Sequence, residues 1–290
     1  MNSISTALRA LGLLILLVLT YGLRPHCFAG VEPELGYQGG APRATISPRV
    51  PFEVGETFVY SVTWKIFDAG IATMRLVEKA RFQNEETYKV TATAHSTGIL
   101  SRVFRVLDVF ESHFQVKEFC SRRITKNIQE GNRRRETVLV FDPKSRQAKL
   151  EERDPSHPEV PAKHSESSIP FCVQDVISAL YLIRTKALKV GEPVNFPVND
   201  GGRTYDVVVE VQAAEEIHTP AGTFQTIRVE PRVFDGLFRK KGRMFVWLTH
   251  DAEKMPVQLK ARMNIGTITA SLTRVSKPPL IQPSNPIPRN

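Results

Sequence analysis

Alternation of apolar and polar side chains restricts the possible folds of this chain more than any other feature. Segments 57–64, 87–94, 257–263 and 267–273 all alternate, and in the first of them the apolar members are Phe58, Tyr60, Val62 and Trp64. Successive side chains of a β-strand point to opposite faces. Each segment therefore predicts a strand with one face in the core and one face exposed to solvent. Turn residues separate these segments. The pattern therefore predicts a mainly β protein with a large antiparallel sheet.

One segment departs from this period. Asp175 can cap a helix over about 176–187, because its carboxylate can accept hydrogen bonds from first-turn N–H groups. Apolar residues surround most of this helix, which predicts that it is buried. We expect a curved sheet, a half-barrel or barrel-like, with the helix in its concave face. Segment 154–170 lacks an apolar period and predicts an exposed loop.

The first 29 residues have the order of a secretory signal peptide. A short region carrying Arg9 is followed by the apolar run 11–23 and then by small residues up to Ala29. The run is short for a membrane span, so we expect cleavage after Ala29 and a periplasmic protein without a transmembrane span. Segment 30–50 predicts a flexible leader, 51–276 a single β-rich domain and 277–290 a proline-rich tail.

The chain is basic. Its net charge of +9 falls to +7 when Arg9 and Arg24 leave with the signal peptide. Basic side chains can meet phosphate-bearing lipid head groups, or they can simply protect strand edges from aggregation. The cluster at Arg239, Lys240 and Lys241 is a candidate rim for an anionic ligand. Export and the lack of an aromatic-plus-basic motif argue against nucleic acid as a partner.

Two cysteines, Cys120 and Cys172, remain in the expected mature chain. In an oxidising compartment they can form one disulfide, and otherwise they are two buried thiols. Sequence alone leaves both readings open, because the geometry of the two Cα atoms decides.

The sequence shows no catalytic or metal-binding constellation. It has no H-E-x-x-H, P-loop, G-x-S-x-G or dinucleotide motif, so we expect no enzyme, no metal and no cofactor. His157 and His164 share a loop, which is the usual setting of solvated histidines. Asp175 and Asp251 can serve as an acid–base pair, but a helix cap and a turn former are the simpler roles.

Aromatic residues supply the candidate ligand contacts. The side chains of Tyr60, Trp64, Tyr181, Phe245 and Trp247 can line an apolar pocket, or they can fill the core. Arg184, on the predicted helix, can bind an anionic ligand or pair with a buried carboxylate, and we favour the ion pair.

Several short motifs occur in a characteristic order: VGETFVYSVTW at 54–64, DVISALY at 175–181, TPAGTF at 219–224, WLTHD at 247–251 and MPV at 255–257. In this order the chain resembles a bacterial exported family, domain of unknown function 3108. The resemblance implies an envelope location and a β-rich fold, and it implies no particular activity.

These observations favour a non-catalytic periplasmic protein that binds a hydrophobic or amphipathic ligand, such as a lipid or a lipidated segment. The alternative is a structural or interaction module of an envelope assembly, with a filled core, an envelope protein as partner and no ligand. Each of the features also fits an ordinary core.

Overall fold

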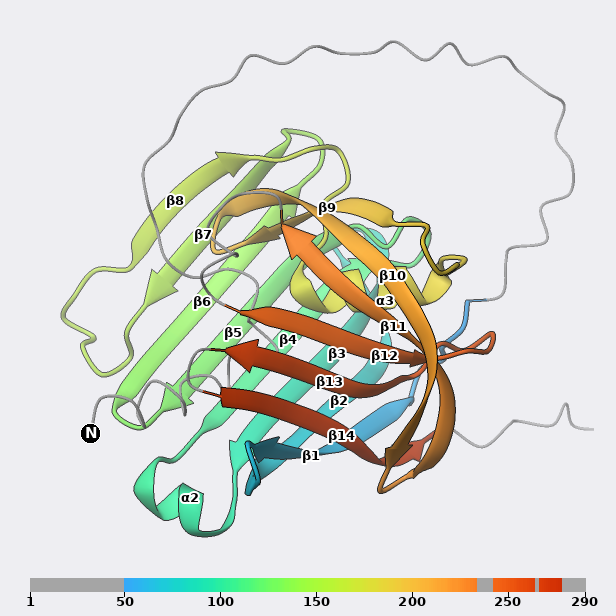
Figure 1. The fold of residues 1–290 in the computed structure, drawn as a ribbon. Coiled ribbons are helices and arrows are strands. Elements are labelled where there is room, and N and C mark those ends of the chain that lie inside the picture. Colours follow the sequence, from blue (N-terminus) through green and yellow to red (C-terminus); the bar gives the residue numbers. More distant parts are fainter. Residues whose placement is uncertain (1–49, 234–241, 264–265, 278–290) are drawn as a thin grey trace, which may run out of the picture.

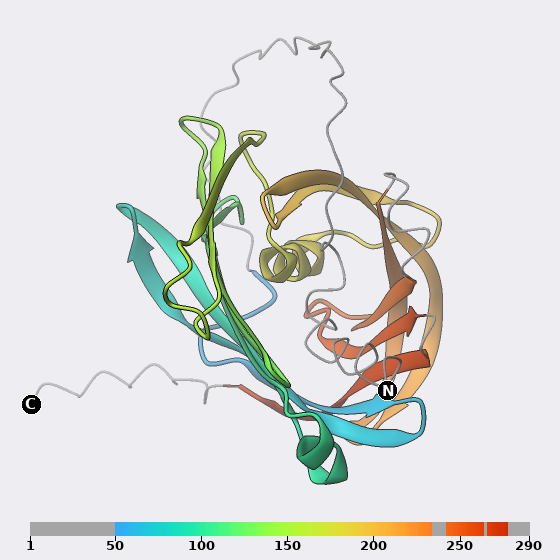
Figure 2. The same cartoon turned by 90° about the vertical axis from the view of Figure 1, so that its left-hand side faces the viewer.

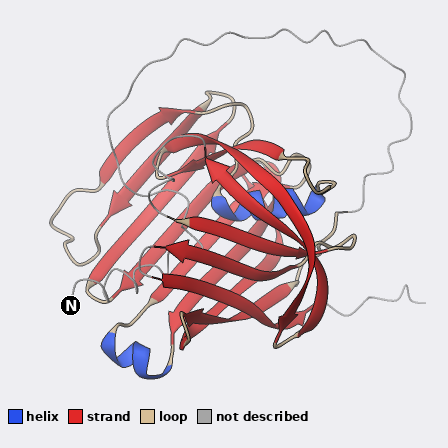
Figure 3. Ribbon diagram, in the orientation of Figure 1, coloured by secondary structure: helices blue, strands red, loops and turns tan. Residues whose placement is uncertain are grey.

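The fold is known from a computed structural model, which describes residues 50–233, 242–263 and 266–277. Strands dominate it, and the described part contains two helices (Figure 3). The helices are α2 (Gly98–Val103) and α3 (Val176–Thr185). The strands are β1 (Thr57–Trp64), β2 (Phe67–Phe82), β3 (Glu85–Ser96), β4 (Leu107–Gln115), β5 (Ser121–Glu130), β6 (Arg133–Asp142), β7 (Gln147–Arg153), β8 (Lys163–Ser168), β9 (Val194–Asp200), β10 (Arg203–Thr219), β11 (Gly222–Val233), β12 (Arg243–Thr249), β13 (Pro256–Met263) and β14 (Gly266–Ser276).

All 14 strands belong to one sheet in the order β8-β7-β6-β5-β4-β3-β2-β1-β14-β13-β12-β11-β10-β9. Neighbouring strands are antiparallel. The first strand, β1, lies between β2 and the last strand, β14, and pairs with both. The sheet curls around α3 into a barrel-like shape that does not close (Figures 1 and 2). The predicted mainly β architecture with a buried helix in a curved antiparallel sheet is therefore confirmed.

Val173 and Gln174 form a short seam that connects the two halves of the curved sheet. The carbonyl of Val173 accepts a hydrogen bond from Ser121 N on β5 at 2.9 Å. The next residue, Gln174, exchanges backbone hydrogen bonds with Pro197 and Asn199 on β9 at 2.9 and 2.8 Å. The stretch before α3 thus bridges β5 and β9 across the opening, which sets where the helix begins.

The disulfide between Cys120 and Cys172 fastens this seam. The two Cα atoms lie 5.1 Å apart, within the range that a disulfide requires. Cys120 directly precedes β5 and Cys172 directly precedes the seam residue Val173, so the bond holds the seam to the strand it pairs with.

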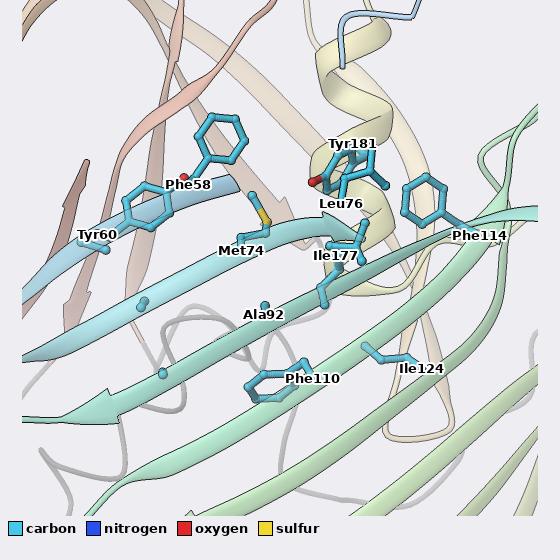
Figure 4. Close-up of a cluster of buried hydrophobic side chains, with 14 of the residues drawn as sticks. Phe58, Tyr60, Met74, Leu76, Ala92, Phe110, Phe114, Ile124, Ile177 and Tyr181 are labelled. Carbon is cyan, nitrogen blue, oxygen red and sulfur yellow. The ribbon is translucent and has the colours of Figure 1, made fainter. Parts of the chain in front are cut away.

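The concave face holds the apolar side chains that the alternation predicts. Phe58, Tyr60, Met74, Leu76 and Phe114 lie on this face and pack towards Ile177 and Tyr181 of α3 (Figure 4). On the other side of the helix, Ile183 packs with valines of β10 and with Val246 and Leu248 of β12. The helix therefore belongs to both apolar clusters and fills one end of the curl.

Some expected elements differ in the structure. The helix ends at Thr185, two residues before the predicted end at 187. The predicted loop 154–170 contains the strand β8, whose side chains are almost all exposed. An edge strand that is exposed to solvent on both faces has no alternation of apolar and polar residues. The sequence pattern therefore could not reveal it. The predicted signal peptide, nearly all of the predicted leader and nearly all of the predicted tail lie outside the described residues.

Candidate functional site

Three of the predicted site residues meet on the concave side, around α3. Tyr60 is buried, and its hydroxyl donates to the carbonyl of Pro256 at 2.8 Å. Tyr181 packs edge-on against Phe52, with ring centroids 4.9 Å apart, and contacts Phe114. Burial raises the pKa of both tyrosine hydroxyls, so both stay neutral. These residues form a packed aromatic core at the helix.

Arg184 joins α3 to the rest of this core. Its guanidinium makes a bidentate ion pair with Glu56, with Nη1–Oε1 2.6 Å and Nη2–Oε2 2.8 Å. It also donates to the carbonyls of Pro51 and Glu253 at 3.1 and 3.2 Å. Both charged side chains are buried. The ion pair uses the forked donors of Arg184, so the structure gives this residue the paired role that we favoured over ligand binding.

Asp175 caps α3 from inside a polar cluster. Its Oδ1 accepts from the backbone N–H groups of Ile177 and Ser178 at 2.7 and 3.0 Å, which makes it the N-cap. Its Oδ2 accepts from the hydroxyls of Ser112 on β4 and Ser121 on β5 at 2.6 and 2.7 Å. The carboxylate therefore has four donors, and its role is to fix the start of the helix on the sheet.

A second buried ion pair crosses the opening. Lys126 on β5 pairs with Asp200 on β9, and both side chains are buried. Burial lowers the pKa of Lys126 to about 8, while the nearby carboxylates of Asp175 and Glu152 act in the opposite direction. Together with the seam, this pair holds β5 and β9 at a fixed separation.

Asp108 is a buried carboxyl on the concave face of β4. Its Oδ1 accepts from Gln129 N at 2.9 Å, and its Oδ2 has no hydrogen-bond partner among the described residues. Burial, and next to it the charge of Glu130, raises its pKa to about 7. This carboxyl therefore changes its charge close to neutral pH.

Lys126, Asp200 and Asp108 are not among the site residues predicted from the sequence. Their signal is present in the pattern, since Lys126 stands at a core-facing position between Ile124 and Ile128. A charged residue at a core-facing position predicts a buried partner. The partner itself lies 74 residues away in sequence, so the pattern cannot identify it.

Phe245 and Trp247 belong to the same buried apolar cluster as Tyr60 and Tyr181. Val246 and Leu248 pack with Ile183 of α3, so the alternating Phe245 and Trp247 point to the opposite face of β12. Every side chain from Phe245 to Thr249 is buried, so both faces of β12 are covered. That Tyr60, Tyr181, Phe245 and Trp247 line one ligand pocket stays a prediction.

On that opposite face, cationic side chains cover the two rings. The guanidinium groups of Arg243, Arg262 and Arg228 lie 4.8, 5.3 and 5.8 Å from the centre of the Phe245 ring. The indole Nε1 of Trp247 donates to Glu215 at 2.7 Å. Arginine stacked on aromatic rings and paired with carboxylates is a stable arrangement of a sheet surface.

The remaining predicted residues are dispersed. Trp64 is the last residue of β1, a strand in the middle of the sheet, and Lys65 lies over its ring at 5.3 Å. Asp251 accepts from Thr249 Oγ1 and from two backbone N–H groups, so it forms the turn after β12. Arg239, Lys240 and Lys241 lie outside the described residues.

In the part of the chain that the structure describes, no three His, Cys, Asp or Glu side chains are grouped so that they can hold a metal ion. His157 is exposed beside Glu159, and His164 lies on the exposed strand β8. No helix of residues 50–233, 242–263 and 266–277 is long and apolar enough to cross a membrane.

Small apolar side chains line part of the concave face away from α3. They are five buried alanines on four strands near the centre of the sheet: Ala72, Ala92, Ala94, Ala261 and Ala270. Ala72 faces Ala94 across β2 and β3, and Ala270 faces Val62 across β14 and β1. Alanine leaves more room above a curved sheet than the Leu, Ile or Phe of a filled core.

Comparisons with known proteins agree with this architecture. Residues 59–273 match the profile of a family described as a protein of unknown function, DUF3108. Among solved structures, the chain is similar to a β-barrel-like protein of the domain of unknown function DUF1849 from Brucella abortus. The two share 10% identity with a TM-score of 0.52, over 77% of this chain and 97% of that one. Such a likeness shows the fold alone.

Two weaker similarities are to a candidate exported protein and a candidate lipoprotein. One is a candidate exported protein with a YmcC-like fold from Bacteroides fragilis, with 10% identity and a TM-score of 0.36 over 78% of this chain and 98% of that one. The other is a candidate lipoprotein from Parabacteroides distasonis, with 11% identity and a TM-score of 0.34 over 77% and 96%. No curated protein matches the sequence.

Proposed function

The chain belongs to the DUF3108 family of proteins of unknown function, and we propose that it is a non-catalytic periplasmic protein that binds a lipid-like ligand on the concave face of its sheet. The observation that carries this proposal is the group of alanines on β2, β3, β13 and β14. These strands belong to the sheet that curves around α3 (Figure 2). The buried alanines put small apolar side chains among the larger ones of its core.

An acyl chain suits this surface because its attraction is non-directional. Burial of apolar surface contributes about 25 cal/mol per Å², so an acyl chain laid along several alanines gains affinity without specific hydrogen bonds. The first 29 residues have the pattern of a signal peptide, which supports an exported protein. The acidic and cationic residues near the helix already have partners, which supports binding over catalysis.

A matched pair of tryptophan variants tests this proposal. Ala94 points into the concave face, and its neighbour Thr93 points to the outer face of the same strand. We expect purified Ala94→Trp to fold and to lose binding of a fluorescent fatty acid, because the indole occupies the ligand's place. Thr93→Trp should bind the probe as the parent does.

The same variants separate the alternative, an interaction module with a filled core. In a filled core, a tryptophan at position 94 causes overpacking and lowers the free energy of unfolding by about 1–3 kcal/mol or more. A parent protein that binds no fatty-acid probe, together with a destabilised Ala94→Trp, would overturn the proposal. The milder variant Ala270→Leu repeats the test should the tryptophan variant fail to fold.

A further inference from the structure

The most exposed apolar side chains of the described residues gather at one end of the sheet. They are Ile66, Ile99, Val103 and Phe67, with exposed fractions of 87, 81, 70 and 60%. Ile66 lies in the turn between β1 and β2, Phe67 is the first residue of β2, and Ile99 and Val103 lie on α2. We call these four residues the apolar tip. Exposed apolar side chains scattered singly need no explanation, but a cluster of the largest ones marks a contact surface.

The two parts of the tip are neighbours in the fold. Thr97 N, at the start of α2, donates to the carbonyl of Ala69 on β2 at 3.2 Å. In Figure 1 the end of β1 and α2 both project at the lower left, away from α3. The tip therefore lies at the opposite end of the sheet from the helix and from the seam.

Basic side chains surround the tip. Lys65, Arg102 and Arg105 are exposed beside it, and none of them has a carboxylate within ion-pair distance among the described residues. Residues 64–69 and 97–107 hold the tip and these three cations, and Asp68 is the one acidic residue in the two segments. The three cations therefore leave a local excess of two positive charges. Unpaired cations next to exposed apolar groups complement anionic head groups above a hydrocarbon layer.

We propose that the apolar tip docks the protein on a bilayer that carries anionic lipids. The Ile, Val and Phe side chains enter the boundary between head groups and acyl chains, while Lys65, Arg102 and Arg105 stay at the level of the phosphates. The lower end of the curl then faces the membrane, and α3 and the disulfide seam face away from it. This inference is independent of what the concave face binds.

Vesicle flotation with the full mature chain tests this proposal. We expect the parent to float with vesicles of phosphatidylcholine containing a quarter of phosphatidylglycerol, and to bind pure phosphatidylcholine less. Added salt should weaken binding, because it screens the attraction of the three cations. Replacing Lys65, Arg102 and Arg105 with Gln should reduce partitioning about fivefold for each charge.

The chain offers a matched control for the apolar part. Phe67→Glu with Val103→Glu changes the tip, and Phe171→Glu with Val190→Glu makes the same substitutions at the other end of the sheet. The exposed fractions are 58% for Phe171 and 55% for Val190, so these control positions are nearly as exposed as the tip. We expect the tip variant to lose vesicle partitioning about tenfold or more and the control variant to keep it.

Three outcomes would overturn the proposal. They are a parent that stays unbound to anionic vesicles, equal binding to both vesicle types, and equal losses in the tip and control variants. A parent dimer in light scattering that the tip variant converts to monomer would assign the surface to a second copy instead. The tip variant should still bind the fluorescent fatty acid, so failure of the docking proposal can be distinguished from failure of the proposed function.

Discussion

Replacing Arg184 with leucine removes the cation that neutralises Glu56 in the interior. Both partners are buried, and the loss of one leaves the other carboxylate uncompensated, at a cost of about 3–5 kcal/mol. The carbonyls of Pro51 and Glu253 also lose their donor, which adds roughly 1 kcal/mol for the two together. We therefore expect Arg184→Leu to lower the free energy of unfolding by about 4–6 kcal/mol.

Thermal unfolding followed by circular dichroism measures this loss. For a domain of this size, 1 kcal/mol shifts Tm by about 2–4 °C, so the variant should melt about 10–20 °C below the parent. The double variant Arg184→Leu, Glu56→Leu removes both charges and should recover most of the loss. Arg153→Leu breaks an exposed pair with Glu136 and should change stability by about 1 kcal/mol or less.

Two results would contradict the predicted cost of the unpaired Glu56 charge. One is an Arg184→Leu variant that melts within a degree or two of the parent. The other is a double variant that is no more stable than the single one, because the cost would then come from lost packing rather than from an unpaired charge.

Three further predictions concern the core. Replacing Cys120 and Cys172 with serine should lower stability by about 4 kcal/mol in the chain-entropy model, given the 52-residue separation, and unfolding of parent and variant in urea measures it. Asp108 holds a proton in the folded state up to about pH 7 but loses it near 3.8 when unfolded, so its contribution to stability falls as pH rises between these values. Asp108→Asn should therefore match the parent at pH 4 and exceed it at pH 8 by on the order of 2–4 kcal/mol; equal stabilities at pH 8 would refute this. Tyr181→Phe should leave Tm unchanged or raise it, because the buried hydroxyl has no hydrogen-bond partner among the described residues; a large drop in Tm would show a missing partner.

Strands with one wet face could be predicted because their period is visible in the sequence. β1, β3, β13 and β14 alternate over most of their length, and the structure places their apolar members inside. The helix α3 could also be predicted, because a cap at Asp175 is a local interaction.

Features that depend on distant residues could not be predicted. The partner of Lys126 is 74 residues away, and only the folded curl brings it close. β8 is polar on both faces and β12 is apolar on both, so neither carries the alternation that assigns a face. The face that each residue of β12 occupies is decided by the register of this strand with β11 and β13.

Native mass spectrometry of the protein purified from the bacterial envelope tests whether the concave face binds a ligand. We expect a polypeptide that begins at Gly30 and carries the extra mass of one lipid-like molecule, and we expect Ala94→Trp to lack this mass while Thr93→Trp retains it. A parent whose mass is that of the polypeptide alone, with or without added fatty acid, would contradict the claim that the concave face is a binding surface.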